Sequence, residues 1–368
     1  MAQPTHGGNI TWAADLAGCS PSSILDFSAS INPLGPPQSA IAAIQANLAT
    51  LRDYPDPDYR QLRSTLSDTH HLSSEWILPG NGSAELLTWA SRELAELPST
   101  YILTPAFSDY LRALRAFDAI AIRCPLDLTD PALGTANEDI DRGLQSLLTL
   151  SQASATSGLL LNNPHNPTGQ LLTREAILPL LDRFALVVVD EAFMDFLPPD
   201  QEQSVMEWVQ NYPNLVVLRS LTKFYSLPGL RLGYAIAHPD RLRRWQQWRD
   251  PWSVNSLAAA VAEAVLYDSK FQQQTWDWLI QARSHLFQGL SALPGLHPYP
   301  SAVNYLLVQC EHSAVDLQQQ LLKRDQILIR DCVSFPELGD RFFRVAVRTQ
   351  AENQRLLSGL TTILEACN

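Results

Sequence analysis

The stretch RSLTKFYSLPGLRLGY, residues 219–234, brings together an amine, two hydroxyl groups and a second cation. Lys223 follows Ser220 and Thr222, and Arg231 comes eight positions later. An amine that attacks an aldehyde must be partly neutral, and a desolvated pocket near other cations favours the neutral form of a Lys. The guanidinium of Arg231 suits a phosphate dianion through paired, charge-assisted hydrogen bonds. This stretch therefore indicates a covalent-catalysis site beside a phosphate site; taken alone, it also allows a surface Lys and an unrelated Arg ion pair.

Short apolar runs around this stretch predict the fold class. Fully apolar strands separated by helical stretches are typical of an α/β protein with a mostly parallel sheet covered on both faces. In such sheets, ligand-binding residues gather at the carboxyl ends of the strands, where Asn162, Asp190 and Ser220 fall. The predicted strands are TYILT (100–104), GLLLN (158–162), ALVVVD (185–190), NLVVLRS (214–220) and RLGYAIA (231–237).

The length of 368 residues favours two domains, because one hydrophobic core rarely serves a chain of this size. Residues 1–37 are rich in Gly, Pro, Ser and Asn, and we expect an irregular arm that packs with the smaller domain or a partner subunit. A large domain is predicted over residues 38–250 and a smaller α+β domain over residues 251–368. Apolar spacing predicts helices over 38–51, 83–97, 256–267, 270–291 and 314–323 and near the C-terminus, with strands in VNYLLV, ILI and FFRVAV.

Composition and charge narrow the classes of function. The net charge of −12 repels nucleic acid and anionic membranes, so no partner of either kind is expected. There is no apolar run of about 18 residues that would span a membrane, and residues 1–51 lack the cationic start of a leader, so a cytoplasmic protein is predicted. Five scattered cysteines without zinc-ligand spacing predict reduced thiols and no metal site. An anionic substrate would need its own cluster of cations.

Six motifs occur along the chain in a recognisable order: GNGSAELL (80–87), PAFSDY (105–110), NNPHNPTG (162–169), VVVDEAF (187–193), SLTKFYSLPGLRLGY (220–234) and FFRVAVR (342–348). Over essentially its whole length the chain resembles the fold-type I aminotransferases and decarboxylases. The resemblance implies the aminotransferase fold, pyridoxal 5′-phosphate (PLP) as the cofactor, a homodimer, and Lys223 as the amine that bonds to the PLP aldehyde and later returns a proton to the substrate carbon.

The same resemblance assigns further contacts to the cofactor. Asp190 would pair with the pyridine nitrogen, and Asn166 would bind the phenolic oxygen; a helix-capping Asp and a simple turn are the alternatives. Tyr110 would stack on the ring, unless it is a core Tyr. Tyr54 would reach across a dimer interface to the partner's PLP phosphate. The phosphate cup would consist of the helix start at Gly82, Ser83 and Ala84 together with Ser220, Thr222 and Arg231.

Substrate contacts are implied for the C-terminal region and the arm. Arg344 occupies the family position that holds the substrate α-carboxylate. Arg330, Arg348, His6 and Asn32 would lie around it, which is more positive charge than one carboxylate needs, so a second anion, a phosphate, is expected. Ion pairs of Arg330 and Arg348 with nearby Asp331 or Glu352 are the alternative.

Within the family, four segments are similar to the threonine-phosphate decarboxylases more than to the histidinol-phosphate aminotransferases. They are HGGN, DFSASINPLGPP, DEAF and ILIRDCVSFPELGDRFFRVAVRT. This similarity implies decarboxylation of L-threonine O-3-phosphate to (R)-1-amino-2-propanol O-2-phosphate in cobalamin biosynthesis. Phe193 replaces the Tyr of a standard transaminase, which removes a hydrogen bond of roughly 0.5–1.5 kcal/mol, and RDCVSFPEL departs from the more usual RDCSNFPGL. A histidinol-phosphate aminotransferase and a non-catalytic regulator on the same fold are the alternatives.

Overall fold

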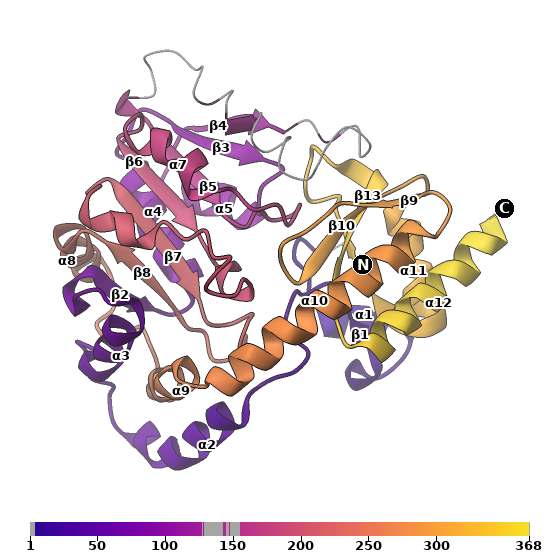
Figure 1. The fold of residues 1–368 in the computed structure, drawn as a ribbon, viewed down its shortest axis with the longest axis horizontal. Helices are drawn as coiled ribbons and strands as arrows, with labels where there is room; N and C mark the ends of the chain where they lie inside the picture. Colours follow the sequence, from indigo (N-terminus) through magenta and orange to yellow (C-terminus); the bar gives the residue numbers. More distant parts are fainter. Residues whose placement is uncertain (1–3, 127, 129–142, 145–146, 148–154, 368) are drawn as a thin grey trace.

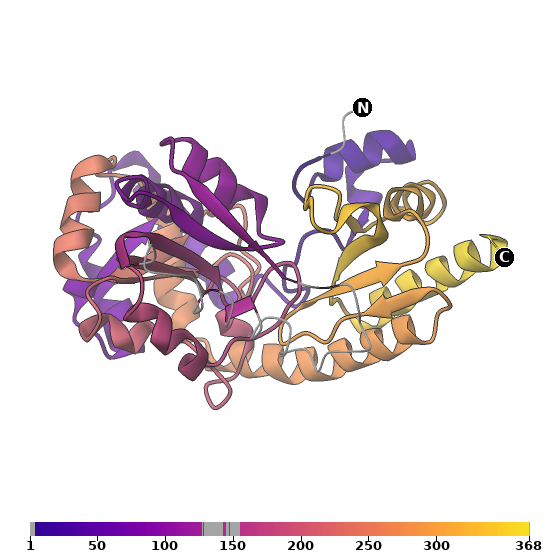
Figure 2. The same ribbon diagram turned by 90° about the horizontal axis from the view of Figure 1, so that it is seen from above.

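The structure is a computed structural model that describes residues 4–126, 128, 143, 144, 147 and 155–367. It contains a seven-stranded sheet, a four-stranded sheet and a two-stranded pair. Figure 1 shows the larger sheet on the left and the smaller sheet on the right. The long helix α10 (Ser269–Ser291) connects them, because it contacts η5 beside the larger sheet and β9 of the smaller one (Figure 2). No helix in the described ranges is long and apolar enough to cross a membrane.

The larger sheet is mostly parallel, which confirms the predicted fold class. Its order is β2-β8-β7-β6-β5-β3-β4, and β8 runs antiparallel to both of its neighbours, β2 and β7, while the pairs from β7 to β4 are parallel. The carboxyl ends of β5, β6 and β7 lie side by side, as the register of Asn162 opposite Asp190 shows. The strands are β2 (Ile77–Gly80), β3 (Thr100–Thr104), β4 (Ala121–Pro125), β5 (Gly158–Asn162), β6 (Leu186–Asp190), β7 (Leu215–Ser220) and β8 (Gly233–Ala237).

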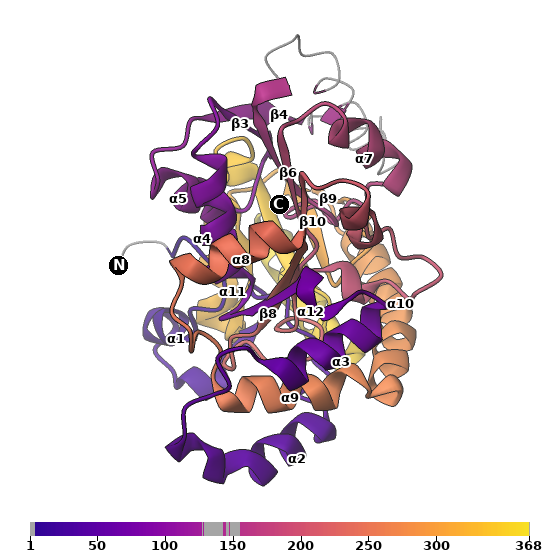
Figure 3. The same ribbon diagram turned by 90° about the vertical axis from the view of Figure 1, so that its left-hand side faces the viewer.

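Helices cover both faces of this sheet. Alternate strand residues enter different cores, so Val188 packs with Leu86 and Trp245 on one face while Val187 and Val189 belong to the other core. Figure 3 shows α4 and α5 on one side of the sheet and α7 on the other. The helices of this part are α2 (Gln38–Asn47), α3 (Arg60–His70), α4 (Ser83–Leu94), α5 (Ser108–Arg115), α7 (Arg174–Leu181), α8 (Pro239–Trp248) and α9 (Ser256–Leu266).

The smaller sheet is antiparallel and carries two of the predicted substrate residues. Its register places Arg330 of β12 directly opposite Arg344 of β13, so both side chains project from the same face. The elements are β9 (Leu296–Pro298), β10 (Tyr305–Cys310), α11 (Ala314–Asp325), β12 (Arg330–Asp331), β13 (Phe342–Ala346) and α12 (Gln350–Cys367). Single 3-10 turns include η2 (Leu48–Arg52), η5 (Met194–Phe196) and η6 (Met206–Gln210); others are η1 (Pro21–Ser23), η3 (Ser74–Trp76) and η7 (Gly339–Arg341).

The N-terminal arm is more regular than predicted, because it contains helix α1 (Ile10–Ala17). Asn9 caps this helix by accepting the Trp12 N–H at 3.0 Å, and Gly18 ends it with a φ of 68°. The buried Ala13 packs with residues of the C-terminal region. Strand β1 (Leu25–Asp26) pairs with β11 (Ile327–Leu328). The prediction missed this helix because the Gly- and Pro-rich composition of the arm favours irregular structure, although Asn9 and Gly18 are standard capping residues.

The end of one helix and the packing of another differ from the expectations. The helix expected over 38–51 ends at Asn47 and continues as the 3-10 turn η2. Helix α9, placed by the sequence in the smaller domain, packs against α2 and α3 of the larger part. The domain limits at residues 37 and 250 remain predictions.

Candidate active site

A cavity of about 300 Å³ lies where the carboxyl ends of β5, β6 and β7 face the arm and strands β12 and β13. This is the edge at which an open α/β sheet usually binds its ligand. Most of the residues predicted from the sequence meet there. The predicted residues that line the cavity are His6, Ser83, Ala84, Tyr110, Asn166, Asp190, Ser220, Thr222, Lys223, Arg231, Arg330 and Arg344.

Lys223 follows strand β7 and turns its amine into the cavity. The Nζ atom donates to Ser220 Oγ at 3.2 Å and lies 5.5 Å from the centre of the Phe193 ring. Burial lowers the pKa of Lys223, Arg231 and Arg344 lower it further, and Asp190 opposes them. These effects shift Lys223 toward the neutral amine, the form that attacks an aldehyde.

Asp190 ends strand β6 and is buried. Its Oδ2 accepts a hydrogen bond from the Tyr110 hydroxyl at 2.7 Å, and its Oδ1 accepts the N–H of Ala192 at 3.0 Å. Burial raises the pKa of Asp190, while the charge of Lys223 and the Tyr110 hydrogen bond lower it. These contacts hold the Asp190 carboxyl group in place in the cavity wall.

Phe107 is a wall residue that was not predicted from the sequence. Tyr110 is almost fully buried with its hydroxyl committed to Asp190, and the Phe107 ring meets it edge-on at 5.6 Å. Phe107 lies three residues earlier in the same PAFSDY motif and also lines the cavity. The stacking role given to Tyr110 stays a prediction, and Phe107 is a second candidate for it.

The start of helix α4 forms one cationic end of the cavity. Gly82 precedes the helix with a φ of 75°, and a Cβ there would lie only 2.5 Å from an Arg231 nitrogen. Glycine therefore leaves room for the guanidinium beside the free N–H groups of the first turn. The hydroxyls of Ser220 and Thr222 lie 2.7 Å apart nearby. Amides, hydroxyls and a guanidinium form a donor set that fits a phosphate.

Arg344 forms a second cationic end. Its guanidinium is buried, donates to Asn166 Oδ1 and to the Ser28 carbonyl at 3.3 Å, and lies 4.8 Å from the Tyr305 ring centre. Within the described residues no carboxylate forms an ion pair with Arg344, and its Nε has no hydrogen-bond partner. Burial lowers the pKa of Arg344. A buried cation without a counter-ion is costly, so this position suits an anionic ligand.

Arg330 forms a third cationic end, beside Arg344, and His6 of the arm lies next to it. Arg330 donates to the Pro4 carbonyl at 3.0 Å and contacts the Thr5 carbonyl and Ser334. It also forms the ion pair with Asp331, at 4.0 Å, that the sequence had left open as an alternative. The ring of His6 lies 5.7 Å from that of Phe107, with Nδ1 3.4 Å from Ser108 Oγ. Burial lowers the pKa of His6, and Asp109 opposes this effect. The arm thus covers this end of the cavity.

Four predicted residues do not line the cavity, namely Gly82, Asn32, Arg348 and Tyr54. Asn32 is buried and donates to the Phe224 carbonyl at 2.8 Å and to Thr275 Oγ1 at 2.9 Å, so it holds the loop after Lys223. Arg348 pairs with Glu352 at 2.8 Å, which is the alternative that the sequence had left open. Tyr54 is 80% exposed and packs on Trp252.

Comparison with known proteins identifies the family. The family described as aminotransferase class I and II matches residues 22–360. The chain belongs to this family. It is 41% identical over 373 residues to the threonine-phosphate decarboxylase of Salmonella typhimurium, covering 98% of this chain and 96% of that protein. Its fold is similar to the crystal structure of L-threonine-O-3-phosphate decarboxylase from Porphyromonas gingivalis, with a TM-score of 0.80 and 26% identity over 92% of this chain and 99% of that chain. It is also similar to the crystal structure of histidinol-phosphate aminotransferase from Clostridium acetobutylicum, with a TM-score of 0.83 and 25% identity over 93% of this chain and 100% of that chain.

Pyridoxal 5′-phosphate is the cofactor of this family, and the cavity fits it. A phosphate donor set, a buried carboxylate and an amine with a lowered pKa lie at one end of the same cavity. The Arg231 guanidinium beside Gly82 and the unpartnered Nε of Arg344 provide donors for anions at both ends of the site. The arrangement can hold PLP together with an anionic amino acid.

Proposed function

We propose that this chain catalyses the PLP-dependent decarboxylation of L-threonine O-3-phosphate to (R)-1-amino-2-propanol O-2-phosphate, a step of cobalamin biosynthesis. The observation that carries the proposal is the pair of adjacent cationic ends at Arg344 and Arg330, in addition to the cofactor phosphate end. Like charges placed directly opposite each other in a sheet are unfavourable unless anions separate them. A substrate with both a carboxylate and a phosphate satisfies this arrangement. The 41% identity to a threonine-phosphate decarboxylase supports it.

The cofactor would be held by residues of the larger sheet and α4. The first-turn amides of Ser83 and Ala84, with Ser220, Thr222 and Arg231, would bind its phosphate. Asp190 would meet the pyridine nitrogen, and Lys223 would bond to the aldehyde carbon. Asn166 would present its amide donors to the phenolic oxygen, because Arg344 already occupies its carbonyl oxygen. When bound, PLP withdraws electrons from the α-carbon of an attached amino acid.

Residues of the smaller sheet and the arm would orient the substrate. Arg344 would bind its α-carboxylate, and Arg330 with His6 would bind its phosphate. Two anchors on a short molecule restrict its rotation, and such orientation decides which bond at the α-carbon breaks. Lys223 is the group that would deliver a proton to the α-carbon after the carboxylate has left. Phe193, without a hydroxyl, places an apolar ring beside that amine.

Histidinol-phosphate aminotransferase is the second candidate, because a structure of that enzyme has a TM-score of 0.83 to this chain. Histidinol phosphate carries a phosphate but no carboxylate, so it would fill only one of the two cationic ends. The two functions are separated by incubating the purified holoenzyme with each substrate. We expect repeated release of carbon dioxide from threonine phosphate without any keto acid. Amino transfer from histidinol phosphate to a keto acid, with no carbon dioxide from threonine phosphate, would contradict the proposal.

We also propose a cytoplasmic homodimer in which Tyr54 contacts the cofactor phosphate of the partner subunit. Tyr54 and Trp252 are exposed aromatic side chains with their ring centres 4.5 Å apart. Exposed aromatic pairs are typical of interfaces. Sedimentation of the holoenzyme tests the dimer, and a Tyr54→Phe variant with weaker PLP retention tests the contact.

A further inference from the structure

A loop of residues 80–82, the β2–α4 loop, leads from the end of β2 into the cationic helix start that borders the cavity. The side chain of Glu85, in the first turn of α4, reaches back over this loop. Its Oε2 accepts the N–H of Asn81 at 2.6 Å. The N–H groups of Ser83 and Ala84 have no intrahelical partner, and both residues line the cavity. Glu85 therefore holds the loop that leads directly into the two amides expected to bind an anion.

Two further donors hold the Glu85 carboxylate in this position. Its Oε1 accepts the indole N–H of Trp89, one turn later in α4, at 3.0 Å. The guanidinium of Arg249 lies 3.7 Å from the same oxygen, and it donates to the Pro79 carbonyl of β2 at 2.5 Å. Only 3% of the Arg249 side chain is exposed. The carboxylate thus connects the β2–α4 loop to its own helix and, through Arg249, to the end of β2.

The charge of Glu85 gives its removal two possible consequences of opposite sign. A helix start attracts anions, but two anions at the same helix start repel each other. Arg249 offsets the charge of Glu85, and neither residue is among those that line the cavity. If repulsion dominates, a phosphate binds more tightly once Glu85 is removed. If Glu85 shapes the β2–α4 loop, a phosphate binds more weakly.

We propose that Glu85 is a positioning residue for the cofactor phosphate. It holds the β2–α4 loop so that the amides of Ser83 and Ala84 and the guanidinium of Arg231 converge on one anion. The ion pair with Arg249 keeps the cost of a second negative charge at this helix start low. The inference rests on the proposed placement of the cofactor phosphate at the start of α4. It adds a residue that acts on the phosphate site from outside the cavity.

The test compares PLP with pyridoxal, which has the same ring and aldehyde but no phosphate. The full-length protein, freed of cofactor, is titrated with each compound, and the visible absorbance of the lysine-linked form is recorded. We expect Glu85→Ala to raise the dissociation constant of PLP about tenfold, because the loop amide loses a charged acceptor, and to leave that of pyridoxal unchanged. An unchanged or lower dissociation constant for PLP would overturn the proposal. An equal rise for both compounds would also overturn it, since Glu85 would then only cap α4.

Glu93→Ala is the matched control, because Glu93 lies about two turns further along the same helix. Glu93 accepts the indole N–H of Trp245 at 3.0 Å and also pairs with Arg244, and its side chain is 12% exposed, compared with 15% for Glu85. We expect this variant to lower the free energy of unfolding about as much as Glu85→Ala, with both dissociation constants unchanged. A rise for PLP as large as that in Glu85→Ala would contradict the proposal.

Glu85→Gln keeps the test decisive if Glu85→Ala does not fold. The amide has nearly the size of the carboxylate, but its single oxygen cannot replace the two that accept from Asn81 and Trp89. We expect a smaller rise of the dissociation constant for PLP alone, and no rise would count against the proposal.

Arg231→Gln separates this inference from the cofactor placement on which it rests. If this variant binds PLP as tightly as wild type does, the phosphate does not bind at the start of α4, and both hypotheses fail. If PLP binding is weaker in Arg231→Gln but unchanged in Glu85→Ala, the placement stands and the role of Glu85 alone is refuted.

Discussion

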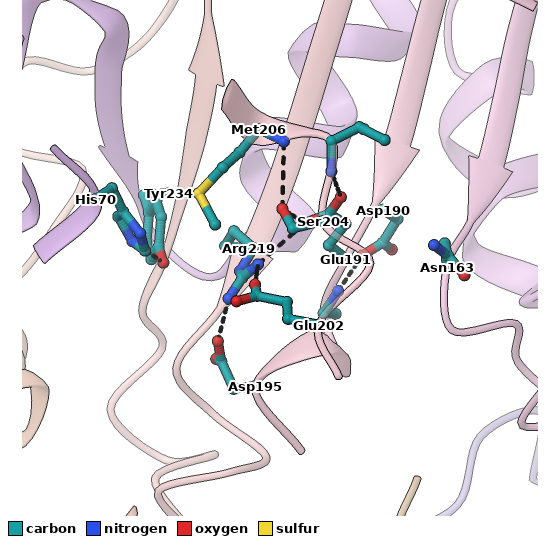
Figure 4. A network of polar contacts seen from close by, with 12 residues as sticks. His70, Asn163, Asp190, Glu191, Asp195, Glu202, Ser204, Met206, Arg219 and Tyr234 are labelled. Atoms are coloured by element: carbon teal, nitrogen blue, oxygen red, sulfur yellow. Dashed lines mark hydrogen bonds and ion pairs between the residues drawn. The ribbon is translucent and has the colours of Figure 1, made fainter. Parts of the chain in front are cut away.

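Arg219 and Arg344 are both buried guanidinium groups within the same molecule, but their surroundings differ in charge. Arg219 is paired with Glu191, Asp195 and Glu202. Arg344 contacts only an amide oxygen, a backbone carbonyl and an aromatic ring among the described residues. One cation therefore has three carboxyl partners (Figure 4), and the other has none among the described residues.

The difference separates a structural arginine from a ligand-binding one. A buried cation whose carboxylates are built into the fold stabilises that fold, and its removal leaves buried charges behind. A buried cation without a carboxylate makes the empty protein less stable and reserves its interaction energy for an anion. Arg330, opposite Arg344, lies between the two types, because it binds backbone carbonyls of the arm and also forms an ion pair with Asp331 at 4.0 Å.

Replacing Arg219 should have the largest effect on stability. We expect Arg219→Met to lower the free energy of unfolding by about 3–5 kcal/mol, because it leaves Glu191 and its neighbours buried without a cation. Urea denaturation of wild type and variant at one protein concentration measures this loss. Glu202→Gln, which keeps the guanidinium, should cost far less. A loss below about 1 kcal/mol in Arg219→Met would remove the structural half of the contrast.

Replacing Arg344 should instead affect catalysis. We expect Arg344→Gln to lower kcat/KM for threonine phosphate roughly 30- to 1000-fold, because the substrate carboxylate loses its partner. This factor corresponds to a loss of about 2–4 kcal/mol of transition-state stabilisation. The free energy of unfolding should stay constant or rise, since repulsion of Arg330 and the desolvation of one cation disappear. Steady-state kinetics and urea denaturation together check both parts. A variant with a lowered free energy of unfolding and an unchanged kcat/KM would reverse our assignment.

The surplus carboxylates around Arg219 should make stability depend on pH. Burial raises the pKa of Glu191 from its usual 4.5 to about 7, although Arg219 opposes the shift. The folded state then holds a proton that the unfolded state releases, so this contribution is complete below about pH 4.5 and disappears as the pH rises through about 7. It amounts to at most about 3 kcal/mol. Urea denaturation from pH 5 to 8 should show a decline in wild type that Glu191→Gln flattens, and parallel curves would contradict this origin.

Local patterns in the sequence predicted much of the fold and of the cofactor site. The strands over 100–104 and 158–162 have the predicted limits, because apolar runs between turns depend on neighbouring residues. The polar residues at the ends of β5 to β7 meet because parallel strands end at one edge. Helix α1 was missed because its packing partner α11 lies about 300 residues away in the chain.

The substrate end was harder to predict, since residue type alone does not show whether a cation is compensated. Arg344 and Arg330 become neighbours through strand register, and the carbonyls that bind Arg330 come from residues 4 and 5. Asn32 has the polarity of a ligand contact, yet its amide donors bind Phe224 and Thr275. The buried ion pair that Asp195 forms with Arg219 of β7 gave no signal in the sequence either, because it joins residues of different elements.

Replacing Arg348 should have the smallest effect on catalysis and stability, and it allows a direct comparison with Arg344. It shares its residue type and its strand-end neighbourhood with Arg344, but it is paired with Glu352 at helical i,i+4 spacing and donates to the Asp26 carbonyl at 3.1 Å. A partly exposed pair of this kind contributes about 1 kcal/mol or less. We expect Arg348→Gln to change kcat/KM for threonine phosphate by less than about threefold and stability by no more than about 1 kcal/mol. In contrast, we expect Arg330→Gln to raise KM for threonine phosphate clearly, since Arg330 lines the cavity and its loss removes a phosphate contact. Equal losses in the two variants would show that a place in the cavity wall does not decide which arginine binds the substrate.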